Sequence, residues 1–212
     1  MPGRSLVRLV PLSTLVFLTL LIAPLSSASD HEWRYEESRS DSHDFVVAGM
    51  LHVHMGVGDL HVRRGDSNKI SLRYTVKSRR EKNVKESRAE FNVHGNDATI
   101  EFHAPMGGNT NFDVELEVPA KTNLDIHEKV GDLSVDEVEG DKDLELGVGD
   151  IRVTREHSAY RVVRASAGIG DINSDGYGET SGWLGKTLKY RGDGQYELRV
   201  HVGVGDITLE GK

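Results

Sequence analysis

The stretch LELGVGDIRV, residues 144 to 153, contains a short motif that the chain repeats. In this motif a Gly-Asp pair stands between a β-branched residue and a Leu or Ile. Close copies occur in MGVGDLHV from Met55, EKVGDLSV from Glu128, AGIGDINS from Ala167 and VGVGDITL from Val202. A pair written five times either carries chemistry at each copy or shapes the backbone at each copy.

The spacing of the Gly-Asp pairs favours a structural role. Three pairs follow one another with a period of nine, at Gly131-Asp132, Gly140-Asp141 and Gly149-Asp150. A strand of about five residues and a turn fit nine positions. Two such units make a coil of about 18 residues, which is close to the short repeats of β-solenoids. The spacing predicts an all-β fold, a right-handed β-solenoid or rack-like stack of short strands, with a β-sandwich as the alternative.

Each residue of the motif has a physical reason to stand at a corner of such a coil. Glycine adopts a positive φ without steric cost, and aspartate accepts a hydrogen bond from a nearby backbone N–H. We expect the Val or Ile before the pair and the Leu or Ile after it to point into the core. The motif therefore indicates corner chemistry rather than catalysis.

The rest of the chain beyond residue 45 alternates between apolar and polar residues, the period of a strand with one wet face. Two segments differ. The charged, straight-chain segment Ser78–Glu90 favours one short helix, and a solvated loop is its alternative. The Gly-rich segment Asp175–Gly194 is an insertion whose Trp183 and Leu184 we expect to plug an end of the core. A hairpin is predicted around the turn at residues 95–97.

The N-terminus has the features of a secretory signal peptide. Arg4 and Arg8 precede an apolar run, and small residues follow it, so residues 1–28 are predicted to be cleaved on export. Residues 29–44 are polar and aperiodic and are predicted to form a flexible leader. Residues 45–212 are predicted to form a single Gly-Asp repeat β-domain. We therefore expect an exported protein that is periplasmic, on the cell surface or extracellular, without membrane insertion after cleavage.

Charge and composition exclude several classes of partner. The net charge is −8, and cleavage of residues 1–28 removes two arginines and brings it to −10. Nucleic acids and anionic lipids reward lysine and arginine, so an acidic chain is a poor match for them. The chain has no cysteine. Disulfide frameworks and zinc-thiolate sites are therefore excluded.

Two segments carry a more specific resemblance. The stretch LEVPAKTNLDIHEKVGDLSVDEVEGDKDLELGVGDIRV and the ending GDGQYELRVHVGVGDITLEGK resemble the bacterial exported "putative adhesin" family of unknown function. The resemblance covers roughly residues 45–212. It implies an elongated, toast-rack-like domain built from repeated Gly-Asp turns. The chain departs from the family at Lys129-Val130, where a small polar pair is commoner before the Gly-Asp.

One segment matches part of a calcium-binding loop. Asp171, Asn173 and Asp175 alternate and Gly176 follows, as in the first half of an EF-hand loop, with Glu179 as a further oxygen ligand. The twelfth position is not the usual glutamate. The alternative is a polar turn between two strands. No other cofactor is expected.

His52 and His54 lie two apart and predict two imidazoles on one face of a strand. They are a possible metal pair with His61 as a third ligand. A solvated polar face is the alternative, because histidines are scattered along the chain.

The sequence contains no nucleophile constellation, so no catalytic residue is predicted and the chain is not expected to be an enzyme. The function expected is an adhesin-like or structural interaction module of the bacterial envelope. Its partner is expected to be an envelope protein or a glycan, and the oligomeric state stays open. The alternatives are an envelope regulatory or sensory domain, and a carbohydrate-active enzyme on a β-helix.

Overall fold

The computed structural model describes residues 33–107, 109–155, 157–183 and 185–211. The expected signal peptide and residues 29–32 lie outside the described residues. The described part is almost entirely β-structure, with one short helix and a 3-10 turn at His157–Ala159. The elements are β1 (Tyr35–Asp44), β2 (Met50–Gly65), β3 (Lys69–Ser78), α1 (Glu81–Glu86), β4 (Arg88–His94), β5 (Asp97–His103), β6 (Thr110–Pro119), β7 (Asn123–Val130), β8 (Leu133–Asp136), β9 (Lys142–Val148), β10 (Ile151–Thr154), β11 (Tyr160–Ile169), β12 (Ile172–Ser174), β13 (Lys186–Arg191), β14 (Tyr196–Val204) and β15 (Ile207–Glu210).

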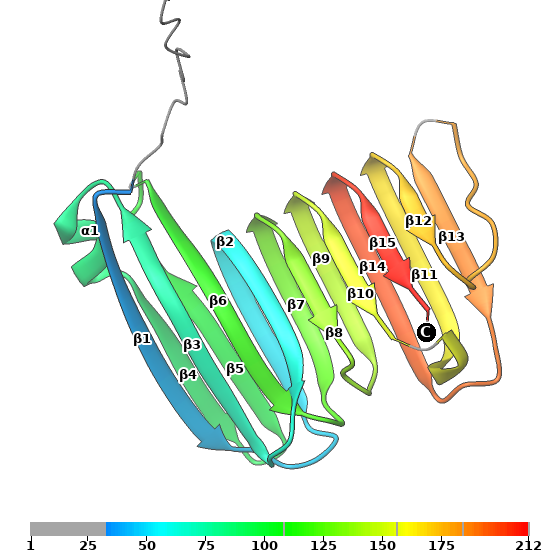
Figure 1. The fold of residues 1–212 in the computed structure, drawn as a ribbon, viewed down its shortest axis with the longest axis horizontal. Helices are drawn as coiled ribbons and strands as arrows, with labels where there is room; N and C mark the ends of the chain where they lie inside the picture. Colours follow the sequence, from blue (N-terminus) through cyan, green and yellow to red (C-terminus); the bar gives the residue numbers. More distant parts are fainter. Residues whose placement is uncertain (1–32, 108, 156, 184, 212) are drawn as a thin grey trace, which may run out of the picture. The chain divides into compact units, whose positions relative to one another are not determined.

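The strands form two layers that face each other (Figure 1). One layer, sheet A, has the order β1-β3-β6-β2-β8-β10-β15-β12. The other, sheet B, has the order β4-β5-β2-β7-β9-β14-β11-β13. Strand β2 belongs to both, because its residues up to Val57 pair in sheet B and those from Gly58 pair in sheet A. The predicted all-β, rack-like architecture is confirmed.

Four coils stack side by side, each with one strand in sheet B and one in sheet A. The first two coils repeat every 18 residues, since Leu124 pairs in register with Lys142 and Leu133 with Ile151. The coil length predicted from the Gly-Asp spacing is therefore correct. Their order in space differs from their order in the chain. The C-terminal coil, β14 with β15, lies between the coil of β9 and β10 and the coil of β11 and β12.

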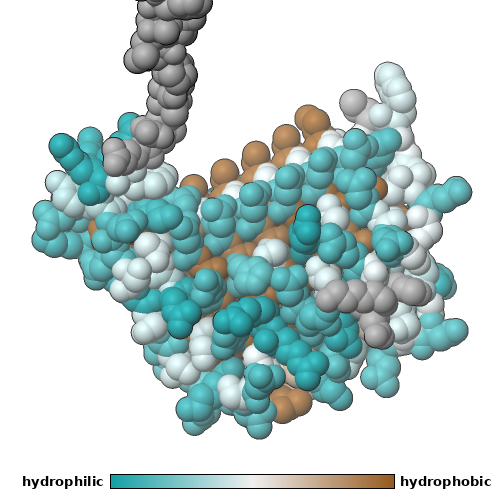
Figure 2. Space-filling model, in the orientation of Figure 1, coloured by the Kyte–Doolittle hydropathy of each residue, from teal (hydrophilic) through white to brown (hydrophobic). Residues whose placement is uncertain are grey.

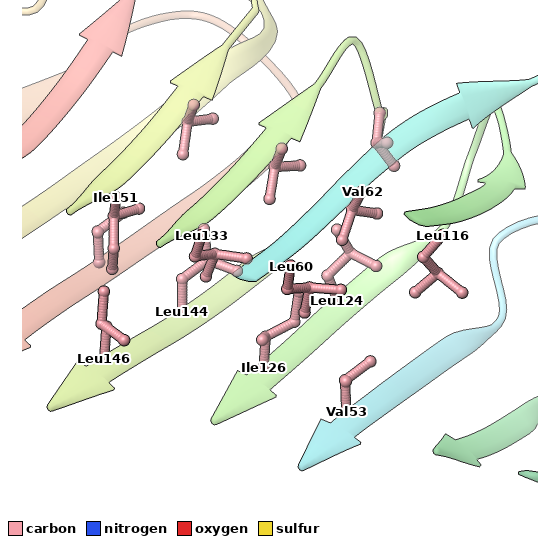
Figure 3. Close-up of a cluster of buried hydrophobic side chains, with 14 of the residues drawn as sticks. Val53, Leu60, Val62, Leu116, Leu124, Ile126, Leu133, Leu144, Leu146 and Ile151 are labelled. Atoms are coloured by element: carbon pink, nitrogen blue, oxygen red, sulfur yellow. The ribbon is translucent and has the colours of Figure 1, made fainter. Parts of the chain in front are cut away.

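The core lies between the two sheets and consists of rows of aliphatic side chains (Figure 3). The Leu or Ile that follows each Gly-Asp pair forms one of these rows. All five are at most 6% exposed: Leu60, Leu133, Ile151, Ile207 and Ile172. Burying one such side chain stabilises the folded state by roughly 1.5–3 kcal/mol. The predicted inward orientation is confirmed for these residues.

The β-branched residues before the Gly-Asp pairs do not point into the core, and this prediction is wrong. They are between 43% and 64% exposed, and neighbouring ones pair in register across the strands. The row of apolar side chains along one edge in Figure 2 corresponds to them. The backbone turns at the glycine, so the alternation of faces breaks there. We call this row the apolar ridge: Val57, Val130, Val148, Val204 and Ile169.

The glycine of each pair is fixed both by conformation and by close approach. Gly149 has φ +132°, and a Cβ placed on it would lie 1.7 Å from the carbonyl oxygen of Gly131. In the same way, a Cβ on Gly205 would lie 1.9 Å from the carbonyl oxygen of Gly149. Each corner glycine therefore allows the backbones of two coils to touch.

Strand β1 corrects the expected flexible leader over residues 35–44. All ten of its residues pair antiparallel with β3. The Nη2 of Arg39 also donates to the carbonyl of Val84 at 3.0 Å. As an edge strand with mostly exposed side chains, β1 carries no apolar period that the sequence could reveal.

The short helix and the hairpin were predicted correctly. Helix α1 lies within Ser78–Glu90, with Val84 buried as its apolar contact. Strands β4 and β5 pair on either side of Gly95, which has φ +64°. Within the described ranges, no helix has the length and apolar character needed to cross a membrane.

The sequence predicts that Trp183 of the insertion fills an end of the core, and this prediction is wrong. Trp183 is 95% exposed, and Leu184 lies outside the described residues. Tyr177 and Leu188 are buried instead, each at 1% exposure. The Ser181–Thr187 bridge, with backbone hydrogen bonds of 2.9 and 2.8 Å, closes a short loop that holds Trp183 away from the core.

We expect Gly149→Ala to lower the free energy of unfolding by more than about 3 kcal/mol, since it combines backbone strain with a clash against Gly131. Gly56→Ala is the matched control, because a Cβ there has no neighbour within 4 Å. Urea denaturation of both variants measures the difference. Equal losses in the two variants would disprove the role of close approach.

Candidate functional site

A groove of about 700 Å³ lies on the outer face of sheet A. Its floor is formed by the residue that follows the buried Leu or Ile of each motif. The five copies differ there, and the floor row consists of His61, Ser134, Arg152, Thr208 and Asn173. Such a volume is in the range of small ligand sites, roughly 300–1,000 Å³.

Four of the five aspartates of the motif form one wall of the groove. Their carboxylates are linked to the backbone of the next coil: the N–H of Asp150 donates to Oδ1 of Asp132 at 3.0 Å, and the N–H of Asp206 donates to Oδ1 of Asp150 at 2.8 Å. The same contact joins the other members at 2.7 to 3.2 Å. We call this row the Asp column: Asp59, Asp132, Asp150, Asp206 and Asp171. The predicted hydrogen bond from a nearby N–H is confirmed, and the donor belongs to the next coil.

The groove has an excess of negative charge. Six carboxylates line it against two guanidinium groups, those of Arg73 and Arg152. Arg73 pairs with Glu115, one of the six, at 3.1 Å, and Arg152 pairs with Glu210 at 3.0 Å. Asp113 is paired with Lys77, so the excess rests on Asp59, Asp132, Asp150 and Asp206. A ligand with positive charge or many hydrogen-bond donors matches this lining.

The four residues expected to bind calcium take different positions in this architecture. Asp171 ends the Asp column, 3.8 Å from the Nζ of Lys186, and Asn173 ends the floor row. Asp175 follows β12, and its N–H donates to the carbonyl of Leu209. Glu179 is exposed in the insertion. Among the described residues, no three His, Asp or Glu side chains are grouped so that they could hold a metal ion. Calcium binding by these residues stays a prediction.

The three histidines considered as metal ligands are separated by the corner of β2. His61 lies on sheet A, with Nδ1 2.6 Å from the Ser134 hydroxyl. His52 and His54 lie on the outer face of sheet B. There Nδ1 of His52 is 2.7 Å from the Asp125 carboxylate, and the ring of His54 stacks on His127 at 5.5 Å.

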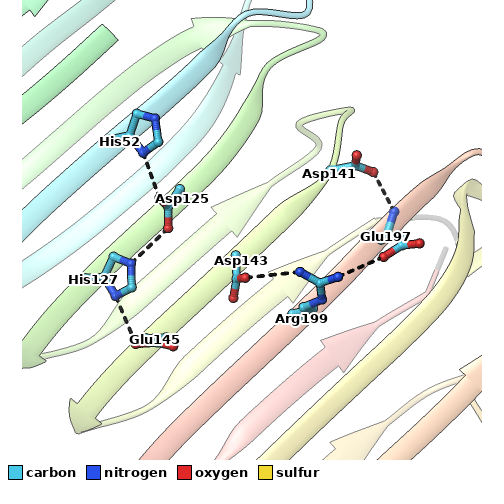
Figure 4. Close-up of polar contacts among 8 residues, drawn as sticks. All are labelled: His52, Asp125, His127, Asp141, Asp143, Glu145, Glu197 and Arg199. Carbon is cyan, nitrogen blue, oxygen red and sulfur yellow. Dashed lines mark hydrogen bonds and ion pairs between the residues drawn. The ribbon is translucent and has the colours of Figure 1, made fainter. Parts of the chain in front are cut away.

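The outer face of sheet B carries rows of polar contacts across the strands (Figure 4). His127 bridges two carboxylates at 3.0 Å each, those of Asp125 and Glu145. Further along, Arg199 contacts Asp143 at 3.6 Å and Glu197 at 3.3 Å. These pairs are partly exposed, so each contributes roughly 0.2–1 kcal/mol. The contacts of His127 with Glu145 and of Arg199 with Asp143 join neighbouring strands, and the other two lie within β7 and within β14.

Glu128 is a buried carboxyl group that the sequence reasoning missed. It is 4% exposed, and neither carboxylate oxygen has a hydrogen-bond partner. Burial raises its pKa to about 8, and the charges of Asp59 and Asp132 add to the rise. Comparison of the five copies of the motif could have revealed Glu128, because the other four copies have an apolar residue at its position: Met55, Leu146, Ala167 and Val202.

Lys142 is a second ionisable group at a core position. Leu124 and Leu198 occupy the equivalent places in the adjacent strands. Its Nζ donates to the carbonyl of Gly140 at 3.0 Å and lies 5.3 Å from the ring centre of Tyr160. Burial lowers the pKa of Lys142 to about 7. The sequence alone did not reveal this residue, because the register between coils was not known.

No family model matches the chain, and no curated protein does. Among solved structures, a "putative cell adhesion protein" from Clostridium sporogenes matches with a TM-score of 0.51 and 16% identity, over 83% of this chain and all of that one. This chain shares its fold. The expected resemblance to the "putative adhesin" family is thereby confirmed at the level of the fold.

Two further solved structures are more distant. A "putative adhesin" from Bacteroides fragilis has a TM-score of 0.24 and 12% identity, over 82% of this chain and 97% of that one. Another from Parabacteroides distasonis has a TM-score of 0.27 and 12% identity, over 82% and 70%. Scores this low do not bear on the fold.

Asp150→Ala is expected to lower the free energy of unfolding by about 1 kcal/mol, because the N–H of Asp206 loses its acceptor. Asp150→Asn keeps an acceptor oxygen and relieves repulsion within the Asp column, so its loss is smaller. Urea denaturation of the two variants gives the order. Equal stability of the Asn and Ala variants would contradict the role of the hydrogen bond.

Glu128 makes the stability of the folded state depend on pH. Its folded-state pKa of about 8 lies above the ordinary value of 4.5, so the unfolded chain releases this proton first. Its contribution to stability is therefore complete below about pH 4.5 and is lost as the pH rises to about 8. The slope is at most about 1.4 kcal/mol per pH unit.

Glu128→Leu places the residue of the adjacent coil at this position and removes the titration. We expect its stability advantage over the wild type to grow from about pH 5 to about pH 8 and then to level off. Urea denaturation across this range measures it, with the exposed Glu179→Gln as control. Parallel curves for wild type and Glu128→Leu would disprove the assignment.

Proposed function

We propose that the protein is an exported, non-catalytic binding module of the bacterial envelope, adhesin-like in type. It holds a basic segment of a partner protein in the groove of sheet A. The acidic lining of this groove carries the proposal, since Asp59, Asp132, Asp150 and Asp206 remain after Glu115 has paired with Arg73 and Asp113 with Lys77. The fold is shared with a protein named for cell adhesion, and the groove supplies the negative charge that would bind a basic segment.

The repeat combines a constant structural position with a variable surface position, and this combination supports binding rather than catalysis. The aspartate is the same in all five copies, and in four of them its carboxylate accepts a backbone N–H of the next coil. The floor residue differs in every copy while its backbone stays in the paired strand. A rigid frame with a variable polar surface suits specific recognition.

Charge determines which partner fits best. Lysine and arginine side chains of a partner can pair with the second carboxylate oxygens along the Asp column, and such complementarity speeds association and selects partners. An extended basic segment can follow the column from coil to coil at the strand spacing of about 4.8 Å. The groove therefore suits a protein segment better than an acidic glycan.

Site-specific photo-crosslinking in the producing cells tests this function. A photo-reactive residue at Thr208, on the groove floor, is expected to form a defined protein adduct. The same residue at Asp143, on the outer face of sheet B, is the control and is expected to form none. In a cell extract, molar salt added before irradiation reduces the Debye length to about 3 Å and should lower the yield of the adduct. Equal labelling at both positions, or none at Thr208, would refute the groove as the binding site.

A further inference from the structure

The apolar ridge projects because glycines flank it on both sides. Each ridge residue is followed by the corner glycine, and in four of the five copies a glycine also precedes it. The residues that precede the ridge lie in one row on the outer face of sheet B. The residues on either side of them in each strand pair in register with those of the neighbouring strand. We call this row the furrow: Gly56, Lys129, Gly147, Gly203 and Gly168.

The furrow is a hollow that the backbone geometry itself creates. A Cβ on Gly147 would lie 2.4 Å from the carbonyl oxygen of Lys129, and one on Gly203 would lie 2.5 Å from that of Gly147. Side chains are therefore excluded from most of the row. The resulting hollow has a volume of about 550 Å³ and includes Gly56, Gly147 and Gly203 in its lining.

The ridge is a continuous apolar surface beside this hollow. Its five side chains are in register on neighbouring strands, so at about 4.8 Å per strand it is about 19 Å long. Exposure runs from 43% at Val130 and Val204 to 64% at Ile169. A contiguous exposed row of β-branched residues marks an interaction surface more often than a solvated one.

Around this edge of the domain the rows follow a fixed order. A polar row on sheet B comes first, then the furrow, the apolar ridge and the Asp column. The polar row pairs in register across the strands and consists of His54, His127, Glu145, His201 and Ser166. A two-fold rotation reverses the order, so that a ridge faces a furrow and a furrow faces a ridge.

We propose that this edge is the interface of a two-fold homodimer, in which the apolar ridge of each copy seats in the furrow of the other. The surface is self-complementary in shape, as an isologous interface requires. Burial of the exposed parts of ten β-branched side chains supplies the apolar gain.

Charge complementarity also favours a second copy as the occupant. In this arrangement the Asp column of one copy faces the polar row of the other. This row carries the imidazoles of His54 and His201, and Lys129 lines the same hollow beside it. Both ring nitrogens of His127 are already engaged, by Asp125 and by Glu145. Glu145 is the one acid of the polar row, and it is already paired with His127 at 3.0 Å. The acidic wall therefore meets hydrogen-bond donors rather than its own kind.

Sedimentation equilibrium of the purified exported protein tests the proposal. The wild type is expected to form a dimer, and Gly56→Leu is expected to weaken the dimer by about tenfold or more, because a side chain then fills the furrow. Gly56 suits this test, since a Cβ there meets nothing within 4 Å and the monomer should fold normally. Thr208→Leu, on the groove floor of sheet A, is the matched control and should dimerise like the wild type.

A second variant changes the apolar ridge itself. Val148→Ser removes apolar surface at the centre of the ridge, where the side chain is 47% exposed, and should also weaken the dimer. Urea denaturation of each variant checks that the fold is intact. A monomeric wild type, or dimers that tolerate both Gly56→Leu and Val148→Ser, would overturn the proposal. The Asp column borders both surfaces, but an adduct of Thr208 with a different protein reports on the groove and sedimentation reports on the dimer, so either proposal can fail without the other.

Discussion

Each coil of the domain turns at a glycine whose Cα lies against a carbonyl oxygen of the coil beside it. At Gly149 the space for a Cβ is occupied by the carbonyl of Gly131, and at Gly205 by that of Gly149. This contact sets the distance and register between coils at the corner. Once the register is fixed, every other position of the motif must form a row, because equivalent residues in successive coils then lie side by side.

The rows have different energetic consequences. The Leu and Ile row stabilises the fold by burial, and the Asp column supplies acceptors for backbone N–H groups that would otherwise lack a protein partner. Stacking also places like charges on adjacent strands, which opposes folding, and each hydrogen bond offsets part of that repulsion. Glu128 and Lys142 also oppose folding, since each places an ionisable group where the neighbouring coils have an aliphatic residue. Their burial lowers stability in a way that depends on pH.

Local patterns were sufficient for part of this structure. The coil length, the hairpin at Gly95 and the helix around Val84 followed from spacing, turn residues and composition. Strand β1 did not, because an edge strand stabilised by backbone pairing needs no apolar period. Trp183 was predicted wrongly, because a large apolar residue in a Gly-rich segment is expected to fill the core. Its loop is closed by the Ser181–Thr187 bridge, and the side chain is exposed.

The sequence by itself determined that the chain is a Gly-Asp repeat with corners nine residues apart and a buried Leu or Ile after the pair in each of the five copies of the motif. These are local properties, since they depend on φ, on turn chemistry and on which residues share a face of a strand. Only the tertiary structure decided that the last coil lies between two earlier ones, which brings Asp206 between Asp150 and Asp171. It also decided that the residues two positions after the aspartates line a groove and those before the glycines form a ridge. Such neighbours are dozens of residues apart in the chain, and the packing of the coils alone brings them together.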